Sequence, residues 1–317
     1  MPDSVALPEM KLSDNDVQAI DDLRDLYGRL RTELGRVIVG QEETIERLSI
    51  CLFARGHALL MGVPGLAKTL LVSKLAETMS LKFSRIQFTP DLMPMDITGT
   101  DILQDSEHGR REFQFVHGPV FANMVLADEI NRAPPKTQAA MLEAMQEHKV
   151  TAVGKTFPLE EPFLVLATQN PVEQEGTYPL PEAQLDRFMF LIELDYPSEA
   201  EEVKIARTTT GDALPELEHL VHAAEIIAHQ NLVRRVPVPD HIYTYSARLV
   251  RQTRPAGDSA PEWLKPLVAW GAGPRAVQNL ILAAKARAAL MGSYMVRLED
   301  IQEVAAPVLT HRVITTF

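Results

Sequence analysis

The first two thirds of the chain alternate between helical patterns and short apolar runs of strand length. Residues 17–34 carry apolar side chains at nearly helical spacing, and a second amphipathic stretch follows Gly40. Short apolar runs then occupy residues 58–61, 86–88, 124–127, 163–167 and 188–192. Helical patterns, such as 69–79 and 135–147, separate several of these runs. Buried strands that alternate with helices predict an α/β fold with a parallel sheet covered on both faces.

Two segments interrupt this alternation. Residues 89–118 are rich in Asp, Pro and Gly and predict an insertion with a short helix or hairpin, and residues 149–159 predict a β-hairpin around Gly154. After Pro197 the strand patterns stop, and helices are expected at 199–210, 218–231, 240–253, 274–291 and 298–304. The predicted parts are an N-terminal tail and helix (1–35), an α/β core (36–196) and a smaller helical domain (197–317).

Composition excludes some classes of protein and disfavours others. The hydrophobic fraction of 46% in 317 residues is that of a globular protein with a sizeable core. The net charge of −12 argues against nucleic acid or an anionic membrane surface as the partner. Cys51 is the single cysteine, so no intramolecular disulfide forms, and we see no apolar run near the ~18 residues of a membrane helix. With no secretory signal pattern, we expect a cytoplasmic protein.

A candidate phosphate-binding loop follows the first apolar run and opens the helical pattern at 69–79. Its residues are Gly62, Val63, Pro64, Gly65, Leu66, Ala67, Lys68 and Thr69. Backbone N–H groups and a helix N-terminus attract anionic oxygens, the lysine adds a positive charge, and the threonine hydroxyl can ligate Mg²⁺. The usual pattern has glycine before the lysine, and Ala67 fits there if its backbone is helical. The alternative is a Gly/Pro turn whose lysine is merely solvated.

Two further apolar runs lead into polar side chains. The run 124–127 precedes Asp128 and Glu129, and the run 163–167 precedes Asn170 by a few residues. Ligands of α/β sheets bind at the carboxyl ends of strands, so these side chains are expected beside the phosphate loop. Asp128 would hold Mg²⁺ through water, Glu129 would polarise an attacking water, and Asn170 would orient that water or contact a terminal phosphate. Each motif alone also fits the exposed start of a loop.

Taken together, these segments resemble the AAA+ ATPases, and among them the MoxR family. The resemblance covers about residues 37–310 and rests on Val39-Gly40-Gln41, the loop with its Ala67, and the strings DEINRAPPKTQ (128–138) and GTYPLPEAQLDRF (176–188). Alanine before the lysine is usual in MoxR-like loops. The resemblance implies the P-loop AAA+ fold, a three-layer αβα core with a parallel sheet and a smaller, all-α lid domain.

The resemblance also implies functions for individual residues. Val39, Gly40 and Gln41 match the segment that packs on adenine, and the nucleotide-binding residues continue along the loop to Leu70. Asn170 matches sensor 1. The insertion at 89–118 matches the helix-2 insert and the hairpin at 149–159 the pre-sensor-1 hairpin, both expected to touch a client protein.

Three arginines are implied to act on phosphates or between subunits. Arg187 matches the arginine finger, which reaches a nucleotide bound by the neighbouring subunit and stabilises the transferred phosphoryl group. Arg275, within the string GAGPRA (271–276), matches sensor 2, through which the lid contacts a phosphate. Arg132 could form a further contact between subunits.

The activity implied is Mg²⁺-dependent ATP hydrolysis in a homo-oligomeric ring, a hexamer. Lys68, Thr69 and Asp128 would bind Mg·ATP. The ring would remodel or mature client protein complexes, or insert metal cofactors into them, together with a partner that carries a von Willebrand factor A domain. One alternative is a nucleic-acid motor of the same clade, against which the charge of −12 argues. Another is an ATP-binding scaffold with little turnover, which would need neither Glu129 nor Arg187.

A few other side chains invite a functional reading that we do not favour. His219 and His222 stand three residues apart on the predicted helix 218–231, where a solvated face is the better interpretation than a metal site. Cys51 is expected to be a small buried apolar residue. The aromatic residues Phe88, Phe113 and Phe115 are expected to fill the core.

Overall fold

The computed structural model of the chain describes residues 12–105, 111–170, 176–211 and 215–316. The chain divides into two compact units, of which the first is Arg29–Ile227 and the second combines Met1–Gly28 with Ala228–Phe317. The divisions between the units fall inside the helices α1 (Asp14–Leu34) and α8 (Ala223–Arg235). The domain boundaries expected at residues 35 and 196 stay predictions.

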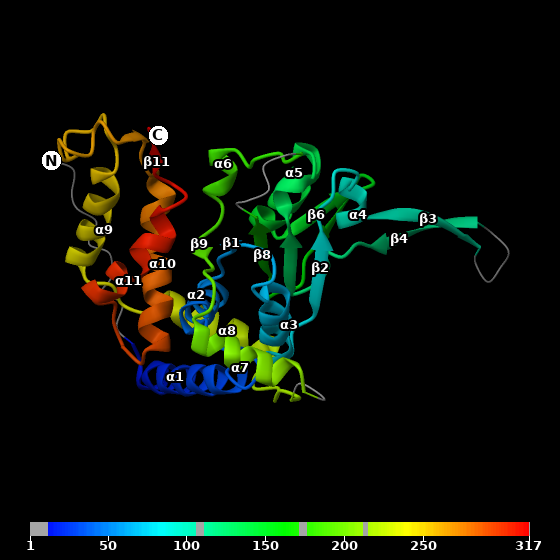
Figure 1. The fold of residues 1–317 in the computed structure, drawn as a ribbon, viewed down its shortest axis with the longest axis horizontal. Coiled ribbons are helices and arrows are strands. Elements are labelled where there is room, and N and C mark those ends of the chain that lie inside the picture. Colours follow the sequence, from blue (N-terminus) through cyan, green and yellow to red (C-terminus); the bar gives the residue numbers. More distant parts are fainter. Residues whose placement is uncertain (1–11, 106–110, 171–175, 212–214, 317) are drawn as a thin grey trace. The chain divides into compact units, whose positions relative to one another are not determined.

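A five-stranded parallel sheet is the centre of the first unit (Figure 1). Its strands lie in the order β2-β5-β8-β1-β9 and every neighbouring pair is parallel. The strands are β1 (Ala58–Met61), β2 (Phe83–Gln87), β5 (Met124–Asp128), β8 (Leu164–Gln169) and β9 (Phe190–Glu193). Each overlaps or adjoins an apolar run of the sequence, and the interior strands are buried almost throughout. The predicted α/β class is confirmed.

Helices of the first unit pack on this sheet. α3 packs against β2 and β5, and α2 packs against β9. Proline occupies the first turn of α5, where its missing N–H costs no hydrogen bond. A capping box between Ser198 and Glu201 starts α7. The helices are α2 (Glu42–Phe53), α3 (Lys68–Thr78), α4 (Pro94–Thr98), the 3₁₀ helix η1 (Ile130–Arg132), α5 (Pro135–Glu147), α6 (Glu182–Leu185) and α7 (Glu199–Thr209).

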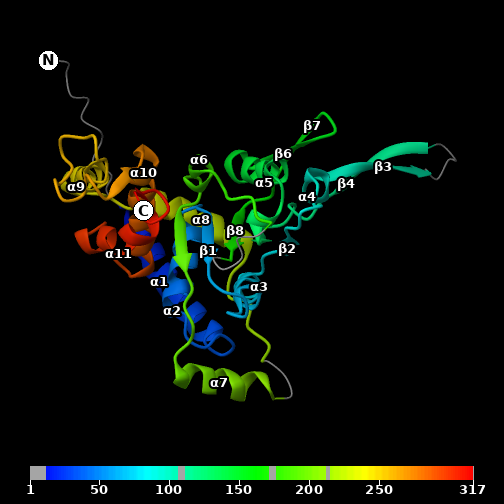
Figure 2. The same ribbon diagram turned by 45° about the horizontal axis from the view of Figure 1, so that its top comes forward.

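Two antiparallel hairpins leave the sheet of the first unit. One pairs β3 (Gly99–Asp105) with β4 (Arg111–His117), and the other pairs β6 (Lys149–Ala152) with β7 (Lys155–Pro158). Figures 1 and 2 both show the β3–β4 hairpin extending away from the sheet. The ring of Phe115 stacks on that of Phe157 with centroids 4.2 Å apart, which joins the two hairpins. The expectation for Phe113 is wrong, because its side chain is 74% exposed, whereas Phe88 is buried in the core as expected.

The segment before α8 is not helical as far back as the sequence pattern predicts. The helix begins at Ala223, not near residue 218. Upstream, the backbone N–H of Leu220 donates to the carbonyl oxygen of Thr78. A ring nitrogen of His219 lies 2.7 Å from the carbonyl oxygen of Glu77. The contact of Leu220 takes up a backbone N–H that a helix would have used. His219 and His222 are therefore not on one helix face, and the described residues contain no group of three or more metal-ligating side chains.

The second unit is mainly helical. α10 (Pro274–Leu290) packs against α9 (Asp240–Gln252) and α11 (Leu298–Leu309). A short antiparallel pair connects β10 (Val268–Trp270) with β11 (Ile314–Thr315). The sequence pattern did not predict this pair, because three and two residues are too few to show an alternation.

Candidate active site

The candidate residues lie at the carboxyl ends of three neighbouring strands. β5 ends at Asp128 and pairs with β8, which ends at Gln169 directly before Asn170. On its other side β8 pairs with β1, which leads into Gly62. Because these strands are parallel, the loop, the acidic pair and Asn170 share one edge of the sheet, where α/β folds bind ligands. Asn170 is buried there.

The loop between β1 and α3 has tight steric requirements. A Cβ atom at Gly62 would lie 2.9 Å from both the Cβ and the carbonyl oxygen of Leu194, so glycine is needed. Gly65 has φ +90°, which favours glycine, and a Cβ there meets no atom within 4 Å. The helical backbone expected at Ala67 is left-handed, with φ 55° and ψ 23°, and this costs a residue with a Cβ about 1–2 kcal/mol. The glycine of the usual pattern would avoid this strain.

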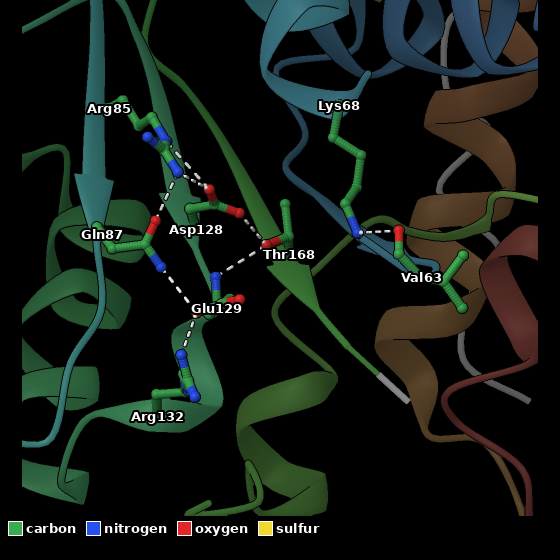
Figure 3. Close-up of polar contacts among 8 residues, drawn as sticks. All are labelled: Val63, Lys68, Arg85, Gln87, Asp128, Glu129, Arg132 and Thr168. Atoms are coloured by element: carbon green, nitrogen blue, oxygen red, sulfur yellow. Dashed lines mark hydrogen bonds and ion pairs between the residues drawn. The ribbon is translucent and has the colours of Figure 1, made fainter. Parts of the chain in front are cut away.

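Lys68 is the first residue of α3 and its side chain turns back onto the loop. Its Nζ donates to the carbonyl oxygens of Gly62 (2.6 Å) and Val63 (3.3 Å), the latter drawn in Figure 3. Partial burial lowers the pKa of Lys68, and the negative charges of Asp128 and Glu129 act in the opposite direction. The ammonium group is therefore in electrostatic reach of both carboxylates, as a site for a phosphate and its cation requires.

Asp128 is held through both of its carboxylate oxygens. Arg85, on β2, donates to Oδ2 from Nε (3.0 Å) and from Nη2 (2.6 Å). The hydroxyl of Thr168, on β8, donates to Oδ1 at 2.6 Å. Figure 3 shows these contacts from the two strands that flank β5. The side chain of Asp128 is only 13% exposed, so its charge is compensated mainly by these neighbours.

Glu129 follows directly and is held by a second set of contacts. Its backbone N–H donates to the Thr168 hydroxyl at 2.8 Å, which makes this hydroxyl a bridge between the two acidic residues. Its Oε2 accepts from Gln87 Nε2 (2.8 Å) and from Arg132 Nη1 (2.9 Å). Glu129 has φ 56° and ψ 49°, a strained conformation for this residue. Arg132, considered for a contact between subunits, thus binds Glu129 of its own chain.

A cavity of about 630 Å³ lies beside the loop, within the first unit. Its lining includes Val39, Gly40, Gln41, Pro64, Gly65, Leu66, Ala67 and Leu70, together with residues 193–197 and side chains of α7. Gln41 Nε2 donates to the Leu66 carbonyl oxygen at 3.2 Å, which ties the segment before α2 to the loop. Gln41 Oε1 is buried and has no hydrogen-bond partner among the described residues. This unsatisfied acceptor belongs to a side chain that lines the cavity.

Two of the remaining candidates lie on helices, and a third directly follows one. Thr69 follows Lys68 in α3, on the helix end that opens toward the loop. Arg187 follows α6 and donates from Nη1 to the Leu142 carbonyl oxygen of α5 at 2.9 Å. With Glu143 and Glu147 it lines a second cavity of about 320 Å³. Arg275 is the second residue of α10, in the second unit.

Residues Arg85, Gln87 and Thr168 were missed by the sequence reasoning. Arg85 and Gln87 are two positions apart on β2 and therefore share one face of the sheet. Thr168 stands one residue before the end of β8, among buried apolar residues. A polar residue near the end of a buried strand is the signal that could have found Thr168. That its strand, β8, lies beside β5 follows only from the order of strands in the sheet.

Comparisons with known proteins identify the family. The family described as "ATPase family associated with various cellular activities (AAA)" matches residues 57–190, and the AAA lid domain matches residues 262–317. Chaperone MoxR1 of Mycobacterium tuberculosis is 46% identical over 285 residues, which is 90% of this chain and 74% of that protein. The chain belongs to the MoxR family of AAA+ ATPases.

Further relatives of this MoxR-family chain agree in fold and length. Protein MoxR of Methylorubrum extorquens is 33% identical over 93% of this chain and 89% of its own. A crystal structure of an ATPase candidate from Cytophaga hutchinsonii is 44% identical, with a TM-score of 0.88 over 95% of this chain and 90% of that one. The AAA+ core, the helical lid and the reaction class, ATP hydrolysis, follow from membership in the family. Among the described residues, none of the helices has the length and apolar character needed to cross a bilayer.

Proposed function

We propose that this MoxR-family protein hydrolyses Mg·ATP at sites shared between the subunits of a homo-oligomeric ring. The observation that carries the proposal is the hydrogen-bonded chain from Asp128 through Thr168 to Glu129, at the same sheet edge as Lys68. It supports the proposal because it holds a cation-binding carboxylate and a water-activating carboxylate side by side, next to a lysine-bearing phosphate loop.

The residues of the site fit an adenine nucleotide and Mg²⁺. The unpartnered Gln41 Oε1 is an acceptor, as the exocyclic amino group of adenine requires, and 630 Å³ is within the usual range for small-ligand sites. The oxygens of Thr69 and Asp128 are of the kind that Mg²⁺ prefers, and Asp128 already attracts one cation, the guanidinium of Arg85. Bound Mg²⁺ would supply charge neutralisation on the phosphates.

In the proposed reaction each residue has a distinct task. Lys68 leaves the carbonyl oxygens of the loop and places its charge on the terminal phosphates. Glu129 orients the attacking water and accepts its proton, with its backbone fixed by Thr168. Asn170, at the end of β8, orients the same water or contacts the terminal phosphate. β5, β8 and the loop thus bring the proposed catalytic residues to one edge of the sheet before ATP arrives, which supports catalysis by positioning.

The two remaining arginines are proposed to act on the phosphates from outside the loop. Arg187 acts in trans on the nucleotide of the neighbouring subunit, where a guanidinium stabilises the charge of the transferred phosphoryl group. In this chain it donates one hydrogen bond to the Leu142 carbonyl oxygen, a bond that it would exchange for one to a phosphate in the ring. Arg275, in the lid, contacts a phosphate and transmits the nucleotide state to α10.

Assembly, clients and partners are proposed from the family. We propose a hexamer, since AAA+ proteins of this family typically oligomerise. The relative named Chaperone MoxR1 supports remodelling or maturation of client protein complexes as the output. Metal-cofactor insertion into such complexes and a partner with a von Willebrand factor A domain belong to the same proposal. The single cysteine, Cys51, is buried and supports a reducing, cytoplasmic location.

The experiment that tests the proposal measures ATP turnover per protomer as protein concentration rises, with Mg²⁺ present. Specific activity is expected to climb with concentration as rings form. Arg187→Ala should lower turnover by about 10³-fold or more while ATP binding persists, because the finger acts in the transition state. Arg36→Ala, which removes an arginine bound to Glu33, is the matched control and should leave turnover unchanged.

The same assay separates the rival functions. Glu129→Gln should bind ATP, measured by calorimetry, and hydrolyse almost none of it. Equal turnover in Arg187→Ala and the wild type within assembled rings, verified by sedimentation, would contradict the shared site. Stimulation by single-stranded DNA would favour a nucleic-acid motor. Wild-type protein that binds ATP without turnover at any concentration would favour a scaffold.

A further inference from the structure

Arg85 contacts Asp128 through two hydrogen bonds to the same carboxylate oxygen. Two N–H groups of the guanidinium donate to the single oxygen Oδ2, at 3.0 and 2.6 Å, as Figure 3 shows. The pair joins two neighbouring strands, since Gln87 is in register with Asp128 and Arg85 is two residues before it on the same face of β2. Charge-assisted bonds of this kind are about twice as strong as neutral ones.

These contacts occupy three of the four acceptor positions of the Asp128 carboxylate, including both on Oδ2. A carboxylate offers about four acceptor positions, two on each oxygen. Arg85 takes both positions on Oδ2, and the hydroxyl of Thr168 takes one on Oδ1. A divalent cation, or a water bound to it, can approach Oδ2 only after the guanidinium moves. Two positive charges on one carboxylate also repel each other, so each cation weakens the binding of the other.

The Arg85 guanidinium has an alternative position away from Asp128. Its side chain is 46% exposed, on the edge strand of the sheet, whereas that of Asp128 is 13% exposed. Its Nη2 also donates to Gln87 Oε1 at 2.6 Å, so it has a neutral partner on its own strand. The guanidinium can therefore move toward solvent and keep a hydrogen bond. Asp128 cannot move in the same way, because Thr168 and its position at the end of β5 hold it.

We propose that Arg85 competes with the divalent cation for Asp128. In the nucleotide-free protein it neutralises the carboxylate, and arrival of the metal with the nucleotide displaces it. This inference rests on the proposed function, in which Asp128 holds Mg²⁺. Arg85 therefore sets how strongly the metal contributes to nucleotide binding. In this proposal Arg85 tunes the affinity of the site for the metal. It is not a catalytic residue, because it does not contact the nucleotide.

The test measures metal affinity in the ternary complex, without turnover. Calorimetry gives the Kd of ADP in EDTA and again in saturating Mn²⁺. The Kd in EDTA divided by the Kd in Mn²⁺ reports how much the metal strengthens ADP binding. Arg85→Gln should increase this ratio roughly 5- to 30-fold over the wild type, the range expected for losing a charged competitor with two hydrogen bonds. The Kd in EDTA should hardly change. Arg85→Lys, which keeps the charge but loses the two-pronged contact, should give a smaller increase.

A matched control accounts for the loss of one positive charge. Arg24→Gln removes an arginine of similar exposure (48%) that pairs with Asp21 and Asp25 on α1, and its ratio should equal that of the wild type. Circular dichroism verifies that each variant is folded, and Arg85→Lys decides the test if Arg85→Gln is not.

The outcomes separate this inference from the proposed function. An Arg85→Gln ratio equal to or below the wild-type ratio overturns the competition. A higher Kd of ADP in EDTA for Arg85→Gln than for the wild type would also overturn the competition, because Arg85 would then be a phosphate ligand. Wild-type protein that binds ADP with no gain from Mn²⁺ would overturn the metal site itself, and with it the proposed function.

Discussion

Ala67 provides a direct test of the strain in the candidate phosphate-binding loop. Replacing it with glycine removes the steric cost of the left-handed backbone, about 1–2 kcal/mol. Glycine gains freedom in the unfolded chain, which takes back roughly 0.5–1 kcal/mol. The methyl group of Ala67 is exposed, so its removal loses little burial. We expect Ala67→Gly to raise the free energy of unfolding by roughly 0.5–1 kcal/mol.

Urea denaturation without nucleotide, followed by circular dichroism, measures this change. Ala139→Gly is the matched control, because Ala139 is also exposed but lies inside the right-handed helix α5. There glycine should lower the free energy of unfolding by about 1 kcal/mol. The two substitutions are chemically identical, so only the backbone conformation gives them opposite signs. Destabilisation of the same size in both variants would refute the reasoning.

Three further predictions follow from buried groups in the first unit. Gln41→Leu removes the unpartnered acceptor of the cavity, so the preference for ADP over GDP, measured by calorimetry, should fall by about tenfold; an unchanged preference would show that Gln41 does not contact the base. Phe157→Ala removes the ring stacked on Phe115 and should lower stability by about 2 kcal/mol in urea denaturation, less than a core phenylalanine because the ring is half-buried. Burial lowers the pKa of His57 to about 4, and the contact of its Nε2 with the Met145 carbonyl oxygen acts in the opposite direction. Its Nδ1 accepts from the Val165 N–H of β8, so the lone pair there is already taken. The unfolded chain then binds the extra proton at pH 4–6.5, so stability is lost as the pH falls through this range, by about 2 kcal/mol between pH 7 and pH 5. His57→Gln should lose less over the same interval, and parallel curves would contradict the assignment.

The amino-acid sequence by itself determined the strands of the parallel sheet and the residue types of the loop. The apolar runs are long enough to mark each strand of the parallel sheet, and glycines, Lys68 and Thr69 follow one another within a single loop. The acidic pair was found in the same way, because Asp128 and Glu129 adjoin a strand in sequence. Local spacing carries all of this information, since the residues concerned are neighbours along the chain.

Only the tertiary structure decided which distant residues meet. Arg85 is 43 residues from Asp128 in sequence, and Thr168 is 40 residues from it on the other side. They meet because β5 lies between β2 and β8, an order that hydrophobic pattern does not fix. Burial was likewise settled by packing. Phe113 and Phe115 look alike in sequence, but they occur in a hairpin where Phe115 stacks on Phe157 and Phe113 faces solvent. A sequence determines which side chains are available, and the pairing of strands determines which of them act together.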